Sequence, residues 1–177
     1  MNCETINPKE LHGNVFELID NKWFLVTAKK HKSDGKINTM TASWGFMGIM
    51  WNKPVANCVI RPVRYTYEFM EEADYYTLSF FSGDYKKALN ILGTKSGRDG
   101  DKIKESGLTL LDVGGFGGKA VTFAEAETTM TCKKLYYQDI NPENFVDAAL
   151  DGNYPNKDYH RMYVGEIVNC TVQKNVE

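Results

Sequence analysis

Runs of β-branched and aromatic residues most constrain how this chain can fold, because they recur along most of its length. The runs are residues 23–30, 36–43, 55–60, 75–81, 120–126, 128–137 and 161–173. Such residue types are enriched in β-strands, and Ser33-Asp34-Gly35 between the first two runs is a hairpin signal. Many short strands with short helices between them predict an all-β protein built as an antiparallel barrel.

Helical patterns are fewer and shorter than the strand patterns. Residues 66–73 show helical spacing of Tyr and Met side chains, and Thr66 is the expected N-cap. Residues 84–92 place alanine and leucine on one face, with Asp84 as the expected N-cap and Gly93 as the expected stop. Both helices are expected at the periphery of the barrel.

Two further helices are expected in the second half of the chain. One covers residues 99–106 and is ended by Gly107. The other covers residues 141–150, with Asn141 as N-cap and Pro142 at the first helical position, where the missing N–H of proline costs nothing.

Composition and charge exclude several classes of protein. A chain of 177 residues fits one domain, expected to span residues 1–177, and 42% hydrophobic with 12% aromatic residues excludes a disordered chain. A net charge of −2 argues against a nucleic-acid partner, because no basic stripe is available to displace counterions. No apolar run approaches the ~20 residues that span a bilayer, and the first ten residues lack a signal-peptide pattern. A cytoplasmic protein without a membrane partner is therefore expected.

The cysteines and histidines do not have the spacing of a metal site. There is no CxxC pair and no metal-ligand spacing of histidines, so no metal is expected. Three of the cysteines lie in strand-like runs, where buried structural thiols are the expected outcome, although cysteines distant in sequence can still meet in the fold. These three are Cys58, Cys132 and Cys170.

Residues 38–81 concentrate the side chains that can carry chemistry. The segment begins with a small, hydroxyl-rich strand, which lets a flat polar ring come within about 3 Å of the backbone. An aromatic and glycine corner follows over residues 44–51, and the next strand ends on Arg61 and Arg64. Guanidinium groups and helix N-terminal amides bind phosphate oxygens. A ring site and a phosphate site in one segment predict a mononucleotide ligand.

Each of these features also has a simpler interpretation. The threonines of the first strand can reflect strand propensity alone. Arg61 and Arg64 can be surface residues that flank the turn at Pro62, although they end an apolar strand instead of lying in a charged run. The glycine cluster Gly114–Gly118 does not fit a dinucleotide fingerprint, because no βαβ unit surrounds it. It is expected to be a mobile loop over the site or an insertion at the barrel rim.

Several motifs in order resemble the flavin reductase-like family of FMN-binding split barrels, and are most similar to its flavoredoxin-type members. The motifs are residues 38–44, 53–55, 61–66, 78–81, 96–99 and 158–166. The resemblance implies a split β-barrel with short peripheral helices. It also implies a homodimer with FMN at or near the subunit interface.

The resemblance assigns site residues as well. Met40, Thr41, Ala42, Ser43 and Trp44 would lie against the isoalloxazine ring of FMN, and Arg61, Arg64 and Thr66 would hold its phosphate. Tyr65 would pack along the ribityl chain or the ring edge, while Ser96 and Lys102 are further cofactor contacts, unless they belong to an exposed turn. The late His160 would lie near the ring face on which nicotinamide stacks, or else be a polar residue that opens a strand.

The function implied by the resemblance is that of an FMN-binding oxidoreductase, namely an NAD(P)H:flavin oxidoreductase. The alternative is a non-enzymatic, flavoredoxin-type electron carrier, whose tightly bound FMN passes electrons to a redox partner protein. A third alternative is a split barrel that binds haem or a pyridoxal-type ligand. The haem version is disfavoured because no strong His or Cys axial-ligand set is present.

Overall fold

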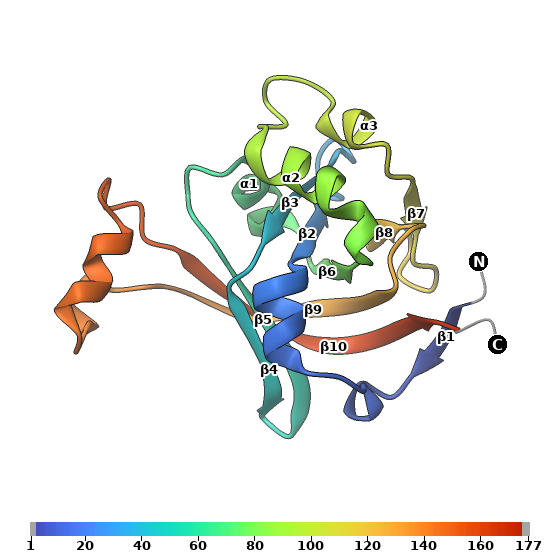
Figure 1. Ribbon diagram of the computed structural model, residues 1–177, viewed down its shortest axis with the longest axis horizontal. Helices are drawn as coiled ribbons and strands as arrows, with labels where there is room; N and C mark the ends of the chain where they lie inside the picture. Colours follow the sequence, from blue (N-terminus) through green and yellow to red (C-terminus); the bar gives the residue numbers. More distant parts are fainter. Residues whose placement is uncertain (1–2, 175–177) are drawn as a thin grey trace.

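A computed structural model describes residues 3–174 and shows a curled antiparallel sheet with short helices beside it (Figure 1). The strand order is β3-β2-β6-β9-β10-β5-β4, and β1 pairs with β10. The strands are β1 (Cys3–Ile6), β2 (Phe24–Lys29), β3 (Ile37–Ala42), β4 (Gly45–Met50), β5 (Lys53–Ile60), β6 (Tyr75–Phe80), β9 (Thr128–Asp139) and β10 (Arg161–Gln173). A separate two-stranded sheet joins β7 (Leu110–Asp112) to β8 (Val121–Phe123).

The connection between β3 and β4 explains why the sheet curls. These strands lie at opposite ends of the strand order, yet only Ser43 and Trp44 separate them in the chain. Two residues span only a few ångströms, so the two sheet edges must meet at this point. The sheet is mostly antiparallel. Among the described residues no ladder joins β3 to β4, so the sheet curls without being closed by hydrogen bonds.

Short helices lie beside the strands. They are α1 (Tyr65–Glu72), α2 (Lys86–Thr94) and α3 (Lys102–Ser106), with a π-helix at Glu17–Lys22 and 3₁₀ turns at Pro8–Glu10, Gly83–Tyr85, Pro142–Asn144 and Ala148–Asn153. Figure 1 shows α1, α2 and α3 together at the end of the molecule where β2 and β3 lie. No helix in residues 3–174 is long and apolar enough to cross a bilayer.

Strand β2 contributes to two hydrophobic clusters because alternate side chains point to opposite faces of a sheet. Phe24 and Val26 pack in the inner cluster with Phe69 of α1, whereas Leu25 packs in an outer cluster with Leu89 of α2. Burial on both faces extends from Phe24 to Ala28 and includes the polar Thr27. It also holds α1 and α2 on either side of this strand, which positions the ends of both helices near β3.

The predicted strands are confirmed to within a few residues at their ends, but three strands escaped prediction. They are β1, β4 and β7. The corner predicted over residues 44–51 is wrong, since most of it is strand β4, paired along its length with β5. The chain reverses at Trp51 and Asn52, which both have positive φ (51° and 57°), as in a type I′ hairpin turn. This strand was not predicted because most of its side chains are exposed and two of its residues are glycines.

The helices are confirmed at three of the four predicted places, but their predicted caps are mostly wrong. Thr66 is the second residue of α1 instead of its cap, because its hydroxyl points inward and accepts a hydrogen bond from the Asn38 side chain (2.9 Å). Asp84 lies in the 3₁₀ turn before α2 and does not cap it, and Gly93 lies within α2. Gly107 does end α3, in the left-handed conformation expected of a glycine C-cap.

The helix predicted over residues 141–150 is wrong. Two separate 3₁₀ turns replace it, although Asn141 caps the first as predicted and Pro142 opens it. The break falls at Phe145, whose ring stacks on Tyr154 with the ring centroids 6.1 Å apart. These turns belong to an arm, residues 140–160, that projects from the sheet between β9 and β10 (Figure 1). Its root is closed by the hydrogen bond from Ile140 N to His160 O (2.9 Å).

The glycine cluster connects β7 to β8 at the rim of the sheet. Gly114, Gly115, Gly117 and Gly118 all have positive φ, which glycine adopts without steric cost. Gly118 O accepts a hydrogen bond from Lys29 Nζ, at the end of β2 that pairs with the start of β3. The cluster therefore lies at the rim, away from the Ala42 end of β3. The thiols of Cys58, Cys132 and Cys170 are buried, as predicted.

Candidate functional site

A groove of about 200 Å³ gathers residues from three distant parts of the sequence. Its lining consists of Met40, Thr41, Ala42, Ser43, Trp44, Val59, Arg61 and His160. Strand pairing explains the gathering, because Arg161 at the start of β10 pairs with Ile60 at the end of β5. That register brings His160 beside Arg61, while the β3–β4 connection brings Ser43 and Trp44 to the same place.

The β3 side of the groove is built from small residues that leave the backbone accessible. Ala42 and Ser43 are only partly buried, and Trp44 is 47% exposed with its ring against the His160 imidazole (ring centroids 5.2 Å apart). The backbone polar groups at the end of β3 can therefore be approached closely by a planar ring. A flat heterocycle with polar edges fits this surface.

His160 is 9% exposed and is held from two directions. Its Nδ1 is 2.9 Å from the Tyr154 hydroxyl of the arm, and Trp44 contacts its ring on the groove side. Burial, with a further contribution from the Arg61 charge, lowers the pKa of His160 to about 4. The imidazole is therefore neutral near pH 7 and can donate one N–H.

The structure brings Arg61 to the groove but gives its guanidinium protein partners. Nη1 donates to both carboxylate oxygens of Asp158 (2.8 and 3.0 Å), and Nη2 donates to Asn153 O (2.8 Å). The guanidinium also lies over the Tyr154 ring, 5.1 Å from its centroid. In this arrangement Arg61 ties the arm to the end of β5, and its charge is balanced by Asp158.

Arg64 and Lys102 form a second cationic group at the C-terminal end of α2. Arg64 Nη2 donates to Gly93 O (2.6 Å), whereas Lys102 Nζ donates to Leu92 O (2.8 Å) and Lys95 O (3.1 Å). Within residues 3–174 neither side chain has a carboxylate within ion-pair distance. A helix C-terminus offsets only about half of a unit charge, so this cation pair keeps a net positive charge.

Burial lowers the pKa values of both members of the cation pair, and neighbouring cations add to the effect. Burial, together with the nearby Arg64 guanidinium, lowers the pKa of Lys102 to about 8. Burial and the Arg61 charge likewise lower the pKa of Arg64. A bound dianion would remove this penalty, because opposite charge favours the protonated forms. The cation pair therefore fits the phosphate of FMN.

The groove and the cation pair adjoin each other along α2. Thr41, in the groove lining, donates its hydroxyl to Leu89 O of α2. One turn later Gly93 packs on Thr41, so closely that a Cβ on Gly93 would lie 3.1 Å from the Thr41 Cβ. A ligand with a ring at one end and a phosphate at the other can therefore use both sites.

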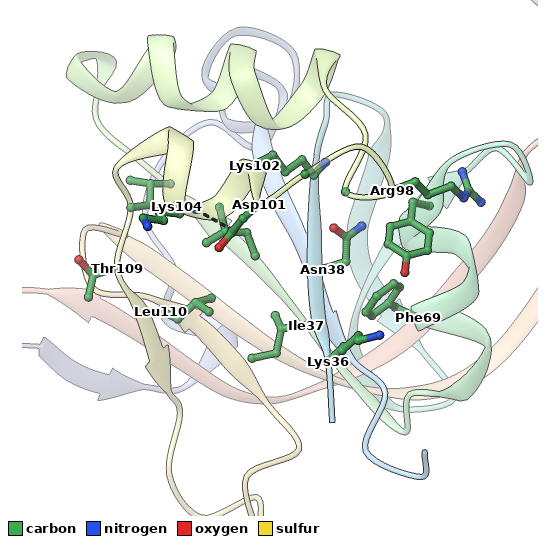
Figure 2. A pocket seen from close by; sticks show the side chains of 15 residues that line it. Lys36, Ile37, Asn38, Phe69, Arg98, Asp101, Lys102, Lys104, Thr109 and Leu110 are labelled. Atoms are coloured by element: carbon green, nitrogen blue, oxygen red, sulfur yellow. Dashed lines mark hydrogen bonds between the residues drawn. The ribbon is translucent and has the colours of Figure 1, made fainter. Parts of the chain in front are cut away.

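Tyr65 is not in the lining of the groove but lines a larger cavity of about 1010 Å³ together with Asn38. Figure 2 shows Asn38 in its middle, Arg98 and Phe69 on one side, and Lys104 and Leu110 on the other. Arg98 donates to Glu68 Oε1 at 2.7 Å, so this cation already has a carboxylate partner. Lys36, also on its wall, pairs with Asp34 (3.1 Å), and Lys102 belongs both to this wall and to the cation pair.

The remaining two predicted residues take different positions. Thr66 is buried and uses its hydroxyl to hold Asn38, so in this structure it faces the protein interior. Ser96 follows α2 and lines a cavity of about 480 Å³ together with Lys102. Its hydroxyl accepts the Arg98 backbone N–H (3.2 Å), so Ser96 shapes the loop beside the cation pair.

Sequence reasoning missed the partners that organise the groove. Tyr154 contacts His160, Asp158 binds Arg61, and Val59 lines the groove floor. Asp158 belongs to the late motif and was within reach of a pattern search. Tyr154 carried no signal, because its position depends on the arm folding back toward β5.

Comparison with known proteins agrees with this geometry. The sequence profile of the family described as "Flavin reductase like domain" matches residues 17–177. No curated protein matches the chain.

Solved structures share the fold. An FMN-binding domain of a flavin reductases-like enzyme from Shewanella baltica is 18% identical with a TM-score of 0.70, covering 97% of this chain and 78% of that one. A flavoredoxin from Desulfovibrio vulgaris is 24% identical with a TM-score of 0.64, covering 86% and 69%. Nitrilotriacetate monooxygenase component B from Bacillus cereus is 16% identical with a TM-score of 0.67, covering 97% and 82%.

The profile match extends over most of the chain and includes every strand of the groove. The solved structures support the same fold. Their sequence identities of 18%, 24% and 16% show similarity of fold alone. The chain therefore belongs to the flavin reductase-like domain family, as its motifs predicted.

Proposed function

We propose that this protein is a split-barrel flavoprotein that binds FMN and that NAD(P)H reduces the bound FMN. The isoalloxazine ring lies in the groove in this proposal, and the phosphate binds Arg64 and Lys102. The observation that carries the proposal is the adjacency of the two sites. Thr41 and Gly93 place the small-residue groove directly beside a cation pair for which the described residues offer no carboxylate. Relatives described as FMN-binding support the cofactor.

The side chains of the groove support a binding and orienting role. FMN, when bound, supplies the ability to accept a hydride from a nicotinamide. Ala42 and Ser43 admit the ring, Trp44 offers an exposed aromatic surface beside it, and neutral His160 presents a hydrogen-bond donor. With a pKa of about 4, the His160 imidazole is neutral at pH 7 and far from its pKa, which favours a positioning role over acid–base catalysis.

Anaerobic reduction tests the reductase activity. Purified protein loaded with FMN should lose the visible absorbance of oxidised flavin when NADH or NADPH is added. His160→Ala should slow this bleaching at least about tenfold, because a misplaced nicotinamide is costly to hydride transfer, while leaving FMN affinity nearly unchanged. The measurement is stopped-flow absorbance, with His12→Ala as the control, because His12 is exposed and lies outside the groove.

The same experiment separates the enzyme from an electron carrier. Absence of bleaching with either nucleotide, together with reduction by a protein donor, would overturn the reductase proposal. It would favour the flavoredoxin-type carrier, a role supported by the similarity to a flavoredoxin. A loss confined to KM in His160→Ala would mean that His160 binds nicotinamide equally in the ground and transition states, whereas a loss in kcat would mean that it acts in the transition state.

We also propose that the protein works as a homodimer, with an apolar face of the β4–β5 hairpin and β9 as the interface. Phe46, Met50, Trp51 and Tyr136 are all at least 41% exposed, and the Trp51 and Tyr136 rings lie 6.2 Å apart. Exposed apolar groups of this size mark interaction surfaces, and aromatic residues are enriched in interfaces. A second copy offers the same face, as a two-fold dimer requires.

Sedimentation tests the dimer. The wild-type protein should sediment with twice the mass of one chain, and Trp51→Asp should shift the population toward monomer, because it places a charge in the apolar face. Val63→Asp, in the exposed turn before α1 and outside this face, should remain dimeric. A monomeric wild type would contradict the proposal.

A further inference from the structure

The arm reaches the groove through one hydrogen bond. The Tyr154 hydroxyl lies 2.9 Å from Nδ1 of His160, and Tyr154 is itself almost completely buried. Phe145 stacks on its ring, Tyr159 contacts it with ring centroids 4.9 Å apart, and the Arg61 guanidinium lies over it. Tyr154 is therefore held in place more firmly than a surface tyrosine.

The hydrogen-bond partners available to the Tyr154 hydroxyl and to His160 Nδ1 determine which of the two donates. Among the described residues the Tyr154 hydroxyl has no partner other than His160 Nδ1. If Nδ1 carried the proton, the buried hydroxyl hydrogen would lack an acceptor, which costs about 1–3 kcal/mol. If the hydroxyl donates to Nδ1, both atoms are satisfied, and the proton of the neutral imidazole must be on Nε2.

The other ring nitrogen remains available. Nε2 of His160 has no hydrogen-bond partner within residues 3–174. The fully buried side-chain polar atoms that lack a partner in this range are His31 Nδ1 and Thr131 Oγ1, and Nε2 of His160 is not among them. Nε2 is therefore not enclosed. Because Tyr154 contacts Nδ1 from the arm and His160 lines the groove, the accessible nitrogen is the one presented to a ligand.

We propose that Tyr154 is a positioning residue that fixes His160 as the Nε2–H tautomer, so that the groove presents a permanent hydrogen-bond donor. The ligand that this donor suits is a planar ring that carries a carbonyl oxygen or another acceptor and packs beside Trp44. The role in turnover rests on the proposed function, whereas the tautomer itself does not.

Burial, more than the charged groups around it, keeps the His160 ring neutral. Arg61 faces it from the end of β5, and Asp158 and Tyr154 face it from the arm, while Trp44 of the β3–β4 connection is uncharged. Arg61 opposes protonation and Asp158 favours it, but burial is the larger effect and keeps the pKa at about 4. The neutral Nε2–H tautomer is therefore the main form at every pH above about 5.

Long-range ¹H–¹⁵N NMR of the imidazole tests the assignment in flavin-free protein. In the wild type at pH 7, Nδ1 of His160 should be unprotonated and Nε2 protonated. Tyr154→Phe should mix the two tautomers and raise the pKa of His160 by up to about one unit, because it removes a hydrogen bond to the neutral form. Tyr159→Phe is the matched control, since its hydroxyl binds Asp151 instead and His160 should be unchanged.

Two results would overturn the proposal: a proton on Nδ1 in the wild type, or an unchanged tautomer and pKa in Tyr154→Phe. The wild-type spectrum decides the tautomer even if the variant does not fold. Turnover is a separate readout, in which FMN-loaded Tyr154→Phe should bleach severalfold more slowly at saturating NADH. An unaltered rate beside an altered tautomer would overturn the positioning role, whereas a wild type that never bleaches would refute the reductase function alone.

Discussion

Arg64→Ala should weaken FMN binding by about 1.5–3 kcal/mol, or roughly 10- to 150-fold, which is the usual size for a charge-assisted hydrogen bond. Among residues 3–174 the side chains of Arg64 and Lys102 have only carbonyl partners at the end of α2, so a phosphate would supply their missing counter-charge. Riboflavin lacks the phosphate and should bind the wild type less well, yet it should lose little more in the variant. Fluorescence titration of both flavins measures the difference.

Two comparisons sharpen this test. Ala42→Leu should obstruct the ring and weaken FMN and riboflavin equally, because it adds bulk at the groove lining. For the wild type, FMN affinity should be highest between about pH 6, above which the phosphate is a dianion, and pH 8, and should fall as pH rises through 8, since Lys102, with a pKa of about 8, loses its charge there. Riboflavin affinity should not follow that profile. Equal losses of FMN and riboflavin in Arg64→Ala would refute the phosphate assignment.

Gly165→Ala should destabilise the fold by about 2–3 kcal/mol, toward the upper end for an overpacked core. Gly165 lies in the middle of β10, where an added Cβ would be 2.6 Å from the Tyr76 hydroxyl oxygen and 2.8 Å from the Cys132 Cβ. The Tyr76 hydroxyl cannot move freely, because it donates to Ala56 O at 3.1 Å. Urea denaturation gives the free energy of unfolding.

Gly83→Ala is the control for the core substitution. Gly83 is exposed in the 3₁₀ turn before α2, outside the proposed dimer face, and an added Cβ there would meet no atom within 4 Å. Its free energy of unfolding should change by no more than about 0.5 kcal/mol, as for most surface substitutions. If both variants lose the same stability, the effect would come from glycine propensity and not from crowding against Tyr76.

Local pattern was sufficient for most of the sheet but not for elements whose partners are distant. The run at residues 161–173 coincides with β10 because β-branched and aromatic residues continue along the whole strand. Strand β4 carries glycines and exposed side chains, and its pairing with β5 becomes visible only in the folded hairpin. In the arm, stacking of Phe145 on Tyr154 prevailed over the helical pattern.

For the candidate site, the sequence alone identified the residue types and several of the positions. Met40–Trp44, Arg61 and His160 were all expected near one ligand, and they line one groove. Sequence could not show that Arg61 binds Asp158, or that Lys102 reaches the carbonyl groups at the end of α2.

The physical reason lies in the range of the interactions. Strand alternation and a glycine C-cap such as Gly107 depend on neighbours within a few residues, so the sequence by itself determined them. The partner of a charge depends on which distant segments the sheet register brings together, as when β10 places His160 beside Arg61. Only the tertiary structure could therefore decide which cations are neutralised by the protein and which remain available for a phosphate.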